Sequence, residues 1–326
     1  MFHSSTQRKH WMFSSVEELQ AARRQANRAY VENFSGRFED FLTAEEESML
    51  CRAHEVEAGR ICKDLFRRNV PGRFPVLATT LVFFKRFYAN NSVMSHHPRD
   101  ILYTSLYMAC KVEEESIPMD SFVNIFPAEE RERIAECILR NELLLLQGLR
   151  FHLAVHNSFR PLEGLLIDIK TRSGLAAASV DGLREKSHYF LTLALYSDAL
   201  FLFAPSQIAL AAIQHAAKHV NVDLSGYFSA LGNAEQINDL ESAIKAIESI
   251  VLSASHQNDG SLAKEKIDAF EQKLKRCRDP KFDPESEEFR KRLEEAEEDL
   301  LGEPKKLKSQ QDSEDSMEED IELVAD

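Results

Sequence analysis

The run CILRNELLLLQGL, residues 137–149, decides the fold class of this chain. From Leu143 to Leu146, apolar side chains point in every direction around a helix axis, which is typical of a helix buried among other helices. We therefore predict a long helix from Glu129 to about Leu149 at the centre of a helical domain.

Four more helices are expected before this run, which makes a five-helix domain that ends near His156. Prolines mark their limits, because a proline ends a helix or occupies the first turn of the next one. The helices are expected at about residues 44–68, 75–90, 98–115 and 119–125.

The second half of the chain repeats this plan. Residues 97–111 (HPRDILYTSLYMACK) align with residues 204–218 (APSQIALAAIQHAAK), with four identities that include Lys111 and Lys218. Five helices are again expected, at 157–172, 181–200, 205–220, 222–231 and 234–254. The sequence thus predicts an all-α fold of two tandem five-helix repeats, over 44–156 and 157–255.

Two further helices are expected to flank the repeats and to pack on the first one. One covers 14–30 within an N-terminal arm of residues 1–43, and the other lies in the segment 256–278. Beyond them, residues 279–326 hold 19 acidic and 7 basic residues and account for −12 of the net charge of −14. Such a composition predicts a largely disordered acidic tail.

Composition limits the possible functions. With 11 glycines in 326 residues and 44% hydrophobic residues, the chain is poor in the turn residues of β-rich folds. The nearly neutral body lacks the clustered basic surface that nucleic-acid binding needs. Five cysteines without a CxxC pair indicate reduced thiols in an intracellular protein. No apolar leader or membrane span is expected.

Three motifs resemble those of the cyclins. They are FFKRFYANNSV (83–93), LYMACKVEEE (106–115) and ELLLLQGLRFHLAVHNSFRP (142–161). The runs SSTQRKHWMFSS (4–15) and LEGLLIDIKTR (162–172) are similar to the H-type cyclins in particular. The resemblance covers about residues 4–275 and implies two cyclin-box repeats.

The resemblance also implies a function. H-type cyclins are non-catalytic subunits that activate a cyclin-dependent kinase within a trimer, the CDK-activating kinase. The implied partners are the catalytic subunit of that kinase, a RING-containing assembly subunit and the core of transcription factor IIH (TFIIH). A nuclear location, roles in transcription and the cell cycle, and no cofactor or metal are expected.

Site residues follow from the same resemblance. Lys111 matches the family lysine that donates to main-chain carbonyls of the kinase, and Glu142 matches the glutamate that accepts from its main-chain N–H groups. Both side chains suit these roles, because they offer several donors or acceptors. Phe84, Phe87, Tyr107 and Leu145 are expected as apolar kinase contacts around them. At least two of the aromatic residues Phe83, Phe84, Phe87 and Tyr88 are expected in the core instead, because a helix rarely exposes four aromatic side chains.

Two departures from the family pattern stand out. The Met-Arg-Ala-Ile-Leu patch of cell-cycle cyclins, which docks substrate peptides, is absent, and residues 55–68 read EVEAGRICKDLFRR instead. Lys85 replaces the aspartate that usually precedes the Arg-Phe pair.

Simpler interpretations remain open. Taken alone, Lys111 is a surface lysine at a helix C-terminus and Glu142 an exposed helix acid. His152/His156 and His215/His219 have the i, i+4 spacing of metal ligands, but no HExxH motif or further ligand completes either set. A metal-dependent hydrolase and a nucleic-acid-binding factor similar to the core of transcription factor IIB are the rival functions.

Overall fold

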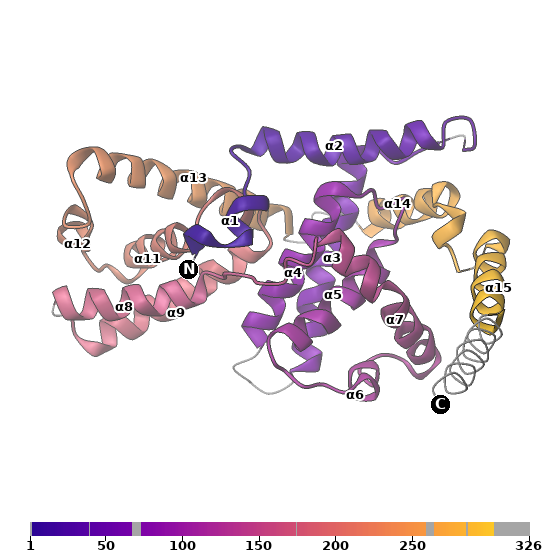
Figure 1. Cartoon of the computed structure of the whole chain (residues 1–326). Helices are drawn as coiled ribbons and strands as arrows, with labels where there is room; N and C mark the ends of the chain where they lie inside the picture. The colour runs from indigo at the N-terminus through magenta and orange to yellow at the C-terminus, as the bar shows by residue number, and fades with distance from the viewer. Residues whose placement is uncertain are drawn as a thin grey trace, which may run out of the picture. The chain divides into compact units, whose positions relative to one another are not determined.

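The computed structural model describes residues 2–38, 40–66, 73–173, 175–258, 264–284 and 286–302, and every regular element in these ranges is a helix. This confirms the all-α prediction. The chain divides into two compact units, Met1–Cys277 and Arg278–Asp326. Both five-helix repeats lie in the first unit (Figure 1).

The first repeat contains the five predicted helices. They are α3 (Ala44–Leu65), α4 (Arg73–Asn90), α5 (Pro98–Val112), α6 (Met119–Val123) and α7 (Arg131–Gly148). The central helix is α5, which packs against α3, α4 and α7 and buries ten of its fifteen residues. The expectation that α7 forms the centre is therefore wrong.

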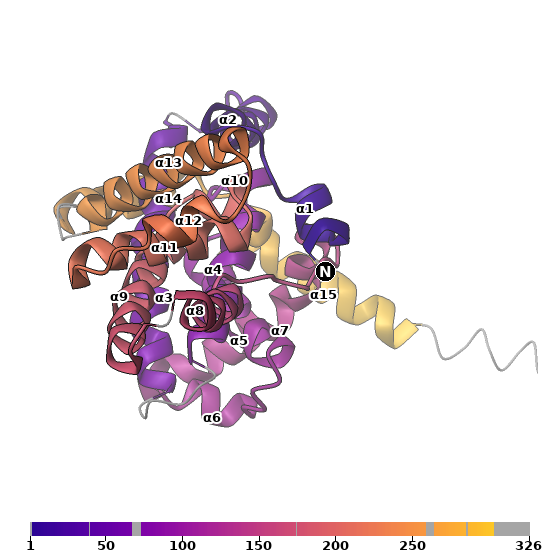
Figure 2. The same cartoon turned by 90° about the vertical axis from the view of Figure 1, so that its left-hand side faces the viewer.

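The second repeat follows the predicted order of five helices, but its second helix is divided into α9 and α10, so it contains six. It consists of α8 (Phe159–Ser173), α9 (Ala177–Leu195), α10 (Ala199–Leu202), α11 (Pro205–Val220), α12 (Ser225–Ser229) and α13 (Ala234–Asn258). Its central helix is α11, which lies between α9 and α13 (Figure 2). Five of the buried residues of α11 are alanines, and their small side chains allow the neighbouring helices to approach closely.

One predicted helix, residues 181–200, is divided into α9 and α10. The hydroxyl of Ser197 donates to the Ala194 carbonyl at 2.8 Å and accepts from the Ala199 N–H at 3.2 Å. Serine side chains compete in this way with the hydrogen bonds of a continuous helix.

Both flanking helices pack on the first repeat, as predicted. Helix α2 (Val16–Asn33) packs against α3 and α4, and α14 (Lys264–Cys277) packs against α3. The Glu271 carboxylate fixes α14, because it lies 3.1 Å from His54 Nε2 and 3.3 Å from His97 Nε2.

The N-terminal arm contacts the linker between the repeats through α1 (Thr6–His10), a helix that was not predicted. The Gln7 side chain accepts from the His156 N–H at 2.8 Å and donates to the His156 carbonyl at 3.3 Å. Trp11 donates its indole N–H to His152 Nδ1 at 3.2 Å, and its ring lies under the guanidinium group of Arg86 at 5.2 Å. His152 and His156 thus lie outside any helix and bind the arm.

The second unit contains η3 (Pro280–Phe282) and α15 (Glu287–Gly302), which pack against each other. Residues 303–326, and with them half of the tail predicted to be disordered, lie outside the described residues. None of the five cysteines forms a disulfide. Within the described ranges, no helix combines the length and the apolar character needed to cross a membrane.

Candidate partner-binding surface

Lys111 and Glu142 lie side by side on the surface of the first repeat. Lys111 belongs to the last turn of α5 and Glu142 to the middle of α7, and Lys111 Nζ is 2.8 Å and 2.9 Å from the two carboxylate oxygens. Their side chains are 43% and 29% exposed. The fold therefore combines a three-donor cation and a two-oxygen acceptor at one accessible position.

The helix end holds the lysine in place. Beyond Lys111 the chain turns sharply at Glu114, which has φ +61°, and the Glu115 N–H donates to the Cys110 carbonyl at 2.9 Å. The Lys111 ammonium also lies 4.9 Å from the centre of the Tyr107 ring, one turn earlier on α5. Tyr107 in turn packs against Phe122. The ammonium is thus oriented by a ring and a carboxylate.

The ion pair can be exchanged for other partners at low cost. A partly exposed pair contributes about 0–1 kcal/mol to stability, because water solvates both charges well. Lys111 could therefore bind main-chain carbonyl groups of another protein, and Glu142 could bind its main-chain N–H groups, in place of their contact with each other. The arrangement suits binding of a polypeptide backbone.

Three of the four predicted apolar contacts lie in the core and not on the surface. Tyr107 is partly buried beside Lys111, whereas Phe84, Phe87 and Leu145 are 0%, 1% and 0% exposed in the core. Phe87 on α4 packs closely against α7, since a Cβ on Gly148 would lie 2.6 Å from its ring. In these positions the three side chains cannot contact a partner directly.

Three exposed apolar residues were missed instead. Leu139 and Leu143 on α7 are 65% and 58% exposed, and Phe151, just after the helix, is 61% exposed. Leu139 and Leu143 lie one turn apart and flank Glu142 on the same side of α7. The run of four leucines at 143–146 predicts complete burial of α7, but one face of this helix remains uncovered.

Lys85 joins the two repeats. Its ammonium donates to the Ser197 carbonyl of the second repeat at 2.7 Å and lies 3.3 Å from the Glu55 carboxylate. Burial raises the pKa of Glu55, and Lys85 opposes that rise. Lys85 and Glu55 line a cavity of about 510 Å³ beside α2, α3 and α4, together with Arg23 and Asp198, whose ion pair is 2.8 Å long.

The second histidine pair, His215 and His219, lies beside an acidic side chain. His215 and His219 lie on α11 with their Nε2 atoms 3.1 Å apart, and His215 Nδ1 is 3.6 Å from Glu248. Among the described residues, no group of three His, Cys, Asp or Glu side chains is arranged to hold a metal ion.

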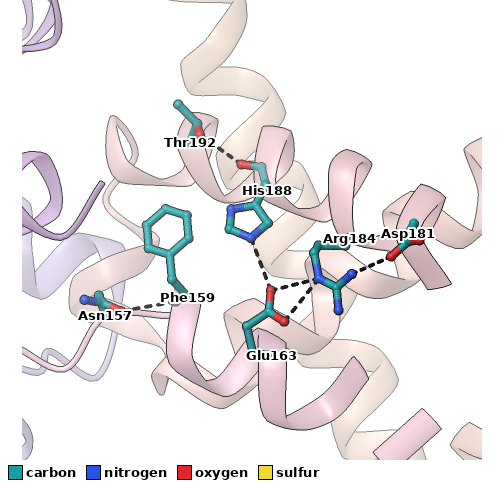
Figure 3. A network of polar contacts seen from close by, with 7 residues as sticks. All are labelled: Asn157, Phe159, Glu163, Asp181, Arg184, His188 and Thr192. Atoms are coloured by element: carbon teal, nitrogen blue, oxygen red, sulfur yellow. Dashed lines mark hydrogen bonds and ion pairs between the residues drawn. The ribbon is translucent and has the colours of Figure 1, made fainter. Parts of the chain in front are cut away.

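A polar network between α8 and α9 has a structural role (Figure 3). The Glu163 carboxylate accepts from Arg184 Nε at 3.1 Å and lies 3.4 Å from His188 Nε2. Arg184 also donates to Asp181 at 2.6 Å, and the His188 ring stacks on Phe159. Glu163 lies on α8, whereas Arg184 and His188 lie on α9, so these contacts join the two helices. Each charged group in the network has a partner.

Comparisons with known proteins agree with this fold. Residues 73–154 match the family model "Cyclin, N-terminal domain" and residues 157–253 match "Cyclin C-terminal domain". Cyclin-H of Xenopus laevis is 38% identical over 263 residues, which cover 77% of this chain and 80% of that protein.

Solved structures are similar as well. A chain in the structure of a CAK complex from Chaetomium thermophilum bound to ATP-gamma-S is 29% identical, with a TM-score of 0.77 and coverage of 90% of this chain and 94% of that one. A chain of the yeast TFIIK (Kin28/Ccl1/Tfb3) complex has the same fold at 24% identity, with a TM-score of 0.58 and coverage of 76% and 99%. Together with the paired five-helix repeats, these matches show that the chain belongs to the cyclin family, as an H-type regulatory cyclin without catalytic activity of its own.

Proposed function

We propose that this chain binds the catalytic subunit of a cyclin-dependent kinase and activates it. The contact surface consists of Lys111, Glu142, Tyr107, Leu139 and Leu143. The observation that carries the proposal is the exposed ion pair of Lys111 and Glu142, with 2.8 Å between Lys111 Nζ and Glu142 Oε1. It stands at the two positions that match the kinase-binding residues of the family.

Each part of the surface has a physical task. Lys111 and Glu142 exchange their mutual contact for main-chain carbonyl and N–H groups of the kinase, which fixes the register of binding. Leu139 and Leu143 supply apolar area that becomes buried only in the complex. Because both leucines are exposed in the free chain, their contribution acts on binding rather than on folding.

Activation follows from selective binding to one state of the kinase. A kinase needs its Lys–Glu ion pair formed and its activation loop placed before ATP is aligned. A cyclin that binds only this state shifts the equilibrium toward it. Moving the population from 1:99 to 99:1 takes about 5.5 kcal/mol of differential binding, which a few desolvated contacts can supply.

The proposal extends to the larger assembly. We place the chain in a nuclear trimer with the kinase and a RING-containing assembly subunit, and through the trimer with the TFIIH core. Support comes from the similar chain in the Chaetomium thermophilum CAK complex. The fold relative in yeast TFIIK is accompanied by Kin28 and Tfb3.

A binding experiment with purified subunits tests the proposal. The double variant Lys111→Ala/Glu142→Ala is expected to weaken kinase binding at least 10-fold and to reduce kinase activation, with an unchanged circular dichroism spectrum. The matched control is Glu57→Ala/Arg60→Ala, which removes another exposed ion pair, on α3. If the first variant binds and activates the kinase as the control does, the assigned residue roles are wrong.

A further inference from the structure

Two histidines on α11 bring their ring nitrogens together. His215 and His219 are four residues apart, which places them one turn apart on the same face of the helix. Their Nε2 atoms are 3.1 Å apart, and the centres of their rings are 4.7 Å apart. When both rings are neutral and no ion is bound, one Nε2 carries a hydrogen that it donates to the other. A metal ion can take the place of that shared hydrogen.

The separation of the two nitrogens is close to that of two ligands of one metal ion. With Zn–N bonds of about 2.0–2.1 Å and tetrahedral angles, two imidazole nitrogens on one zinc ion lie about 3.3 Å apart. The distance between His215 Nε2 and His219 Nε2 is 3.1 Å. Only a small rotation of the two rings is therefore needed to aim both lone pairs at one ion.

The helix and its neighbours hold the ligands in place. Helix α11 is the central helix of the second repeat, and it ends at Asn221, whose N–H donates to the Ala217 carbonyl. The His215 ring packs on Phe190, with the ring centres 4.8 Å apart. A ligand pair on such a packed helix loses little conformational freedom when it binds an ion.

The charges near the pair favour the tautomer that binds a metal. The Glu248 carboxylate on α13 lies 3.6 Å from His215 Nδ1. Its negative charge favours a hydrogen on Nδ1, which leaves Nε2 of His215 with its lone pair. The C-terminal end of α11 adds negative partial charge, which attracts a cation. Lys218 opposes a cation here, although its ammonium is held by Glu248 at 2.9 Å.

The pair is accessible and leaves room for water in the coordination shell. His219 is exposed, and the side chain of His215 is 20% exposed. Among the described residues, no third His, Cys, Asp or Glu side chain completes a set of ligands, so water has to fill the remaining positions. Imidazole nitrogens suit zinc, copper and nickel, whereas magnesium and calcium prefer oxygen ligands.

We propose that His215 and His219 form a surface site for one divalent transition-metal ion, with Zn²⁺ as the ion that fits two imidazoles and two waters. Glu248 is a positioning residue that orients His215. The inference is independent of the proposed function, because the site lies on the second repeat and requires no kinase. The expectation of no metal rests on the missing HExxH motif and third ligand, and a site of this kind needs neither.

Isothermal titration calorimetry of the full chain with ZnCl₂ tests the proposal. The unaltered chain is expected to bind one equivalent of Zn²⁺ at this site. Both His215→Ala and His219→Ala should bind it about 10-fold or more weakly, because each removes one of two protein ligands. The matched control is His156→Ala, which removes a histidine of the other pair with i, i+4 spacing and should bind Zn²⁺ at the unaltered strength.

Lys218 provides a variant with the opposite sign. Lys218→Ala removes a positive charge beside the ion and releases the Glu248 carboxylate from its contact at 2.9 Å. Zinc should therefore bind about 3-fold more tightly or better. Such a gain cannot result from misfolding, and a loss of affinity in Lys218→Ala would contradict the assigned position of the ion.

Melting temperatures show whether the variants are folded. His219 is exposed, so His219→Ala should melt with the unaltered chain when no zinc is added. Zinc should raise the melting temperature of the unaltered chain and of His156→Ala, and leave that of His219→Ala unchanged. The inference is overturned if the unaltered chain shows no saturable zinc binding. Binding that survives both substitutions at full strength, or that falls equally in His156→Ala, also overturns it.

Discussion

Lys111 and Glu142 are unremarkable in sequence, and the fold brings their charged ends to 2.8 Å. The pair joins the C-terminus of α5 to the middle of α7, where water still reaches both side chains. A buried pair would resist exchange with a partner, because removing one charge would leave the other desolvated. Partial exposure therefore makes the pair suitable for reversible binding.

The buried carboxyl group of Glu47 should make the stability of the chain depend on pH. Burial raises the pKa of Glu47 from 4.5 to about 7, although Ser92 donates to its carboxylate. A raised carboxyl pKa gives stability that is present at low pH and is lost as the pH rises through 7. The free energy of unfolding of Glu47→Gln relative to the unaltered chain should thus increase by about 2 kcal/mol between pH 5 and pH 8.

Denaturant unfolding at several pH values measures this difference. Glu57→Gln is the control, because Glu57 is an exposed acid on α3. A difference between Glu47→Gln and the unaltered chain that stays constant with pH would show that Glu47 does not titrate in this range.

Trp11, the single tryptophan of the chain, reports on the N-terminal arm. Its N–H donates to Nδ1 of His152, which must be unprotonated to accept. Burial, together with His10, Arg86 and Arg150, lowers the pKa of His152. A lowered histidine pKa gives stability that is present above its ordinary value and is lost as the pH falls. Acidification from pH 7.5 to 5.5 should therefore release the arm.

Tryptophan fluorescence tests this release. Trp11 is 2% exposed, so its emission should shift to longer wavelength at pH 5.5. His152→Asn keeps an acceptor that does not titrate and should reduce the shift. Emission of the unaltered chain that is constant between these pH values contradicts the prediction.

At the scale of elements, α7 connects the core with the proposed binding surface. Leu145 is buried on one side, while Leu139 and Leu143 are exposed on the other. Movement of α7 relative to α4 would displace Glu142, so tight packing between these helices should be required for binding.

A substitution at Gly148 tests how tightly α7 packs against α4. A Cβ at Gly148 would lie 2.6 Å from the Phe87 ring, whereas nothing lies within 4 Å of a Cβ at Gly164 on α8. Gly148→Ala should therefore lower the free energy of unfolding by about 1–3 kcal/mol. Gly164→Ala should raise it by about 0.5–1 kcal/mol, because alanine favours the helix. Thermal melts of both variants check the signs, and equal effects would contradict the packing argument.

The sequence alone predicts where the helices lie better than it predicts which of their side chains are buried. Proline limits and helical periodicity located the helices of both repeats, because these signals are local. The same signals could not distinguish the buried Phe84 and Phe87 from the exposed Leu139 and Leu143, since burial depends on which helix packs against which face. The Ser197 break was missed because it depends on side chain–backbone hydrogen bonds.

At the scale of the whole molecule, polar contacts join the two repeats. Lys85 donates to the Ser197 carbonyl, Arg23 pairs with Asp198 at 2.8 Å, and the Phe13 N–H donates to the Phe201 carbonyl at 2.8 Å. Helix α2 thus packs against helices of the first repeat and contacts the second repeat through the ion pair of Arg23 and Asp198. These contacts tie both repeats into one compact unit.

Hydrogen–deuterium exchange of this chain, with and without the purified kinase subunit, shows whether the kinase binds the surface around Lys111 and Glu142. We expect the kinase to protect the amides of residues 107–115 and 139–151 and to leave those of 215–219 and 245–252 unchanged. Protection confined to the second repeat, or none in either region of the first, would contradict this expectation.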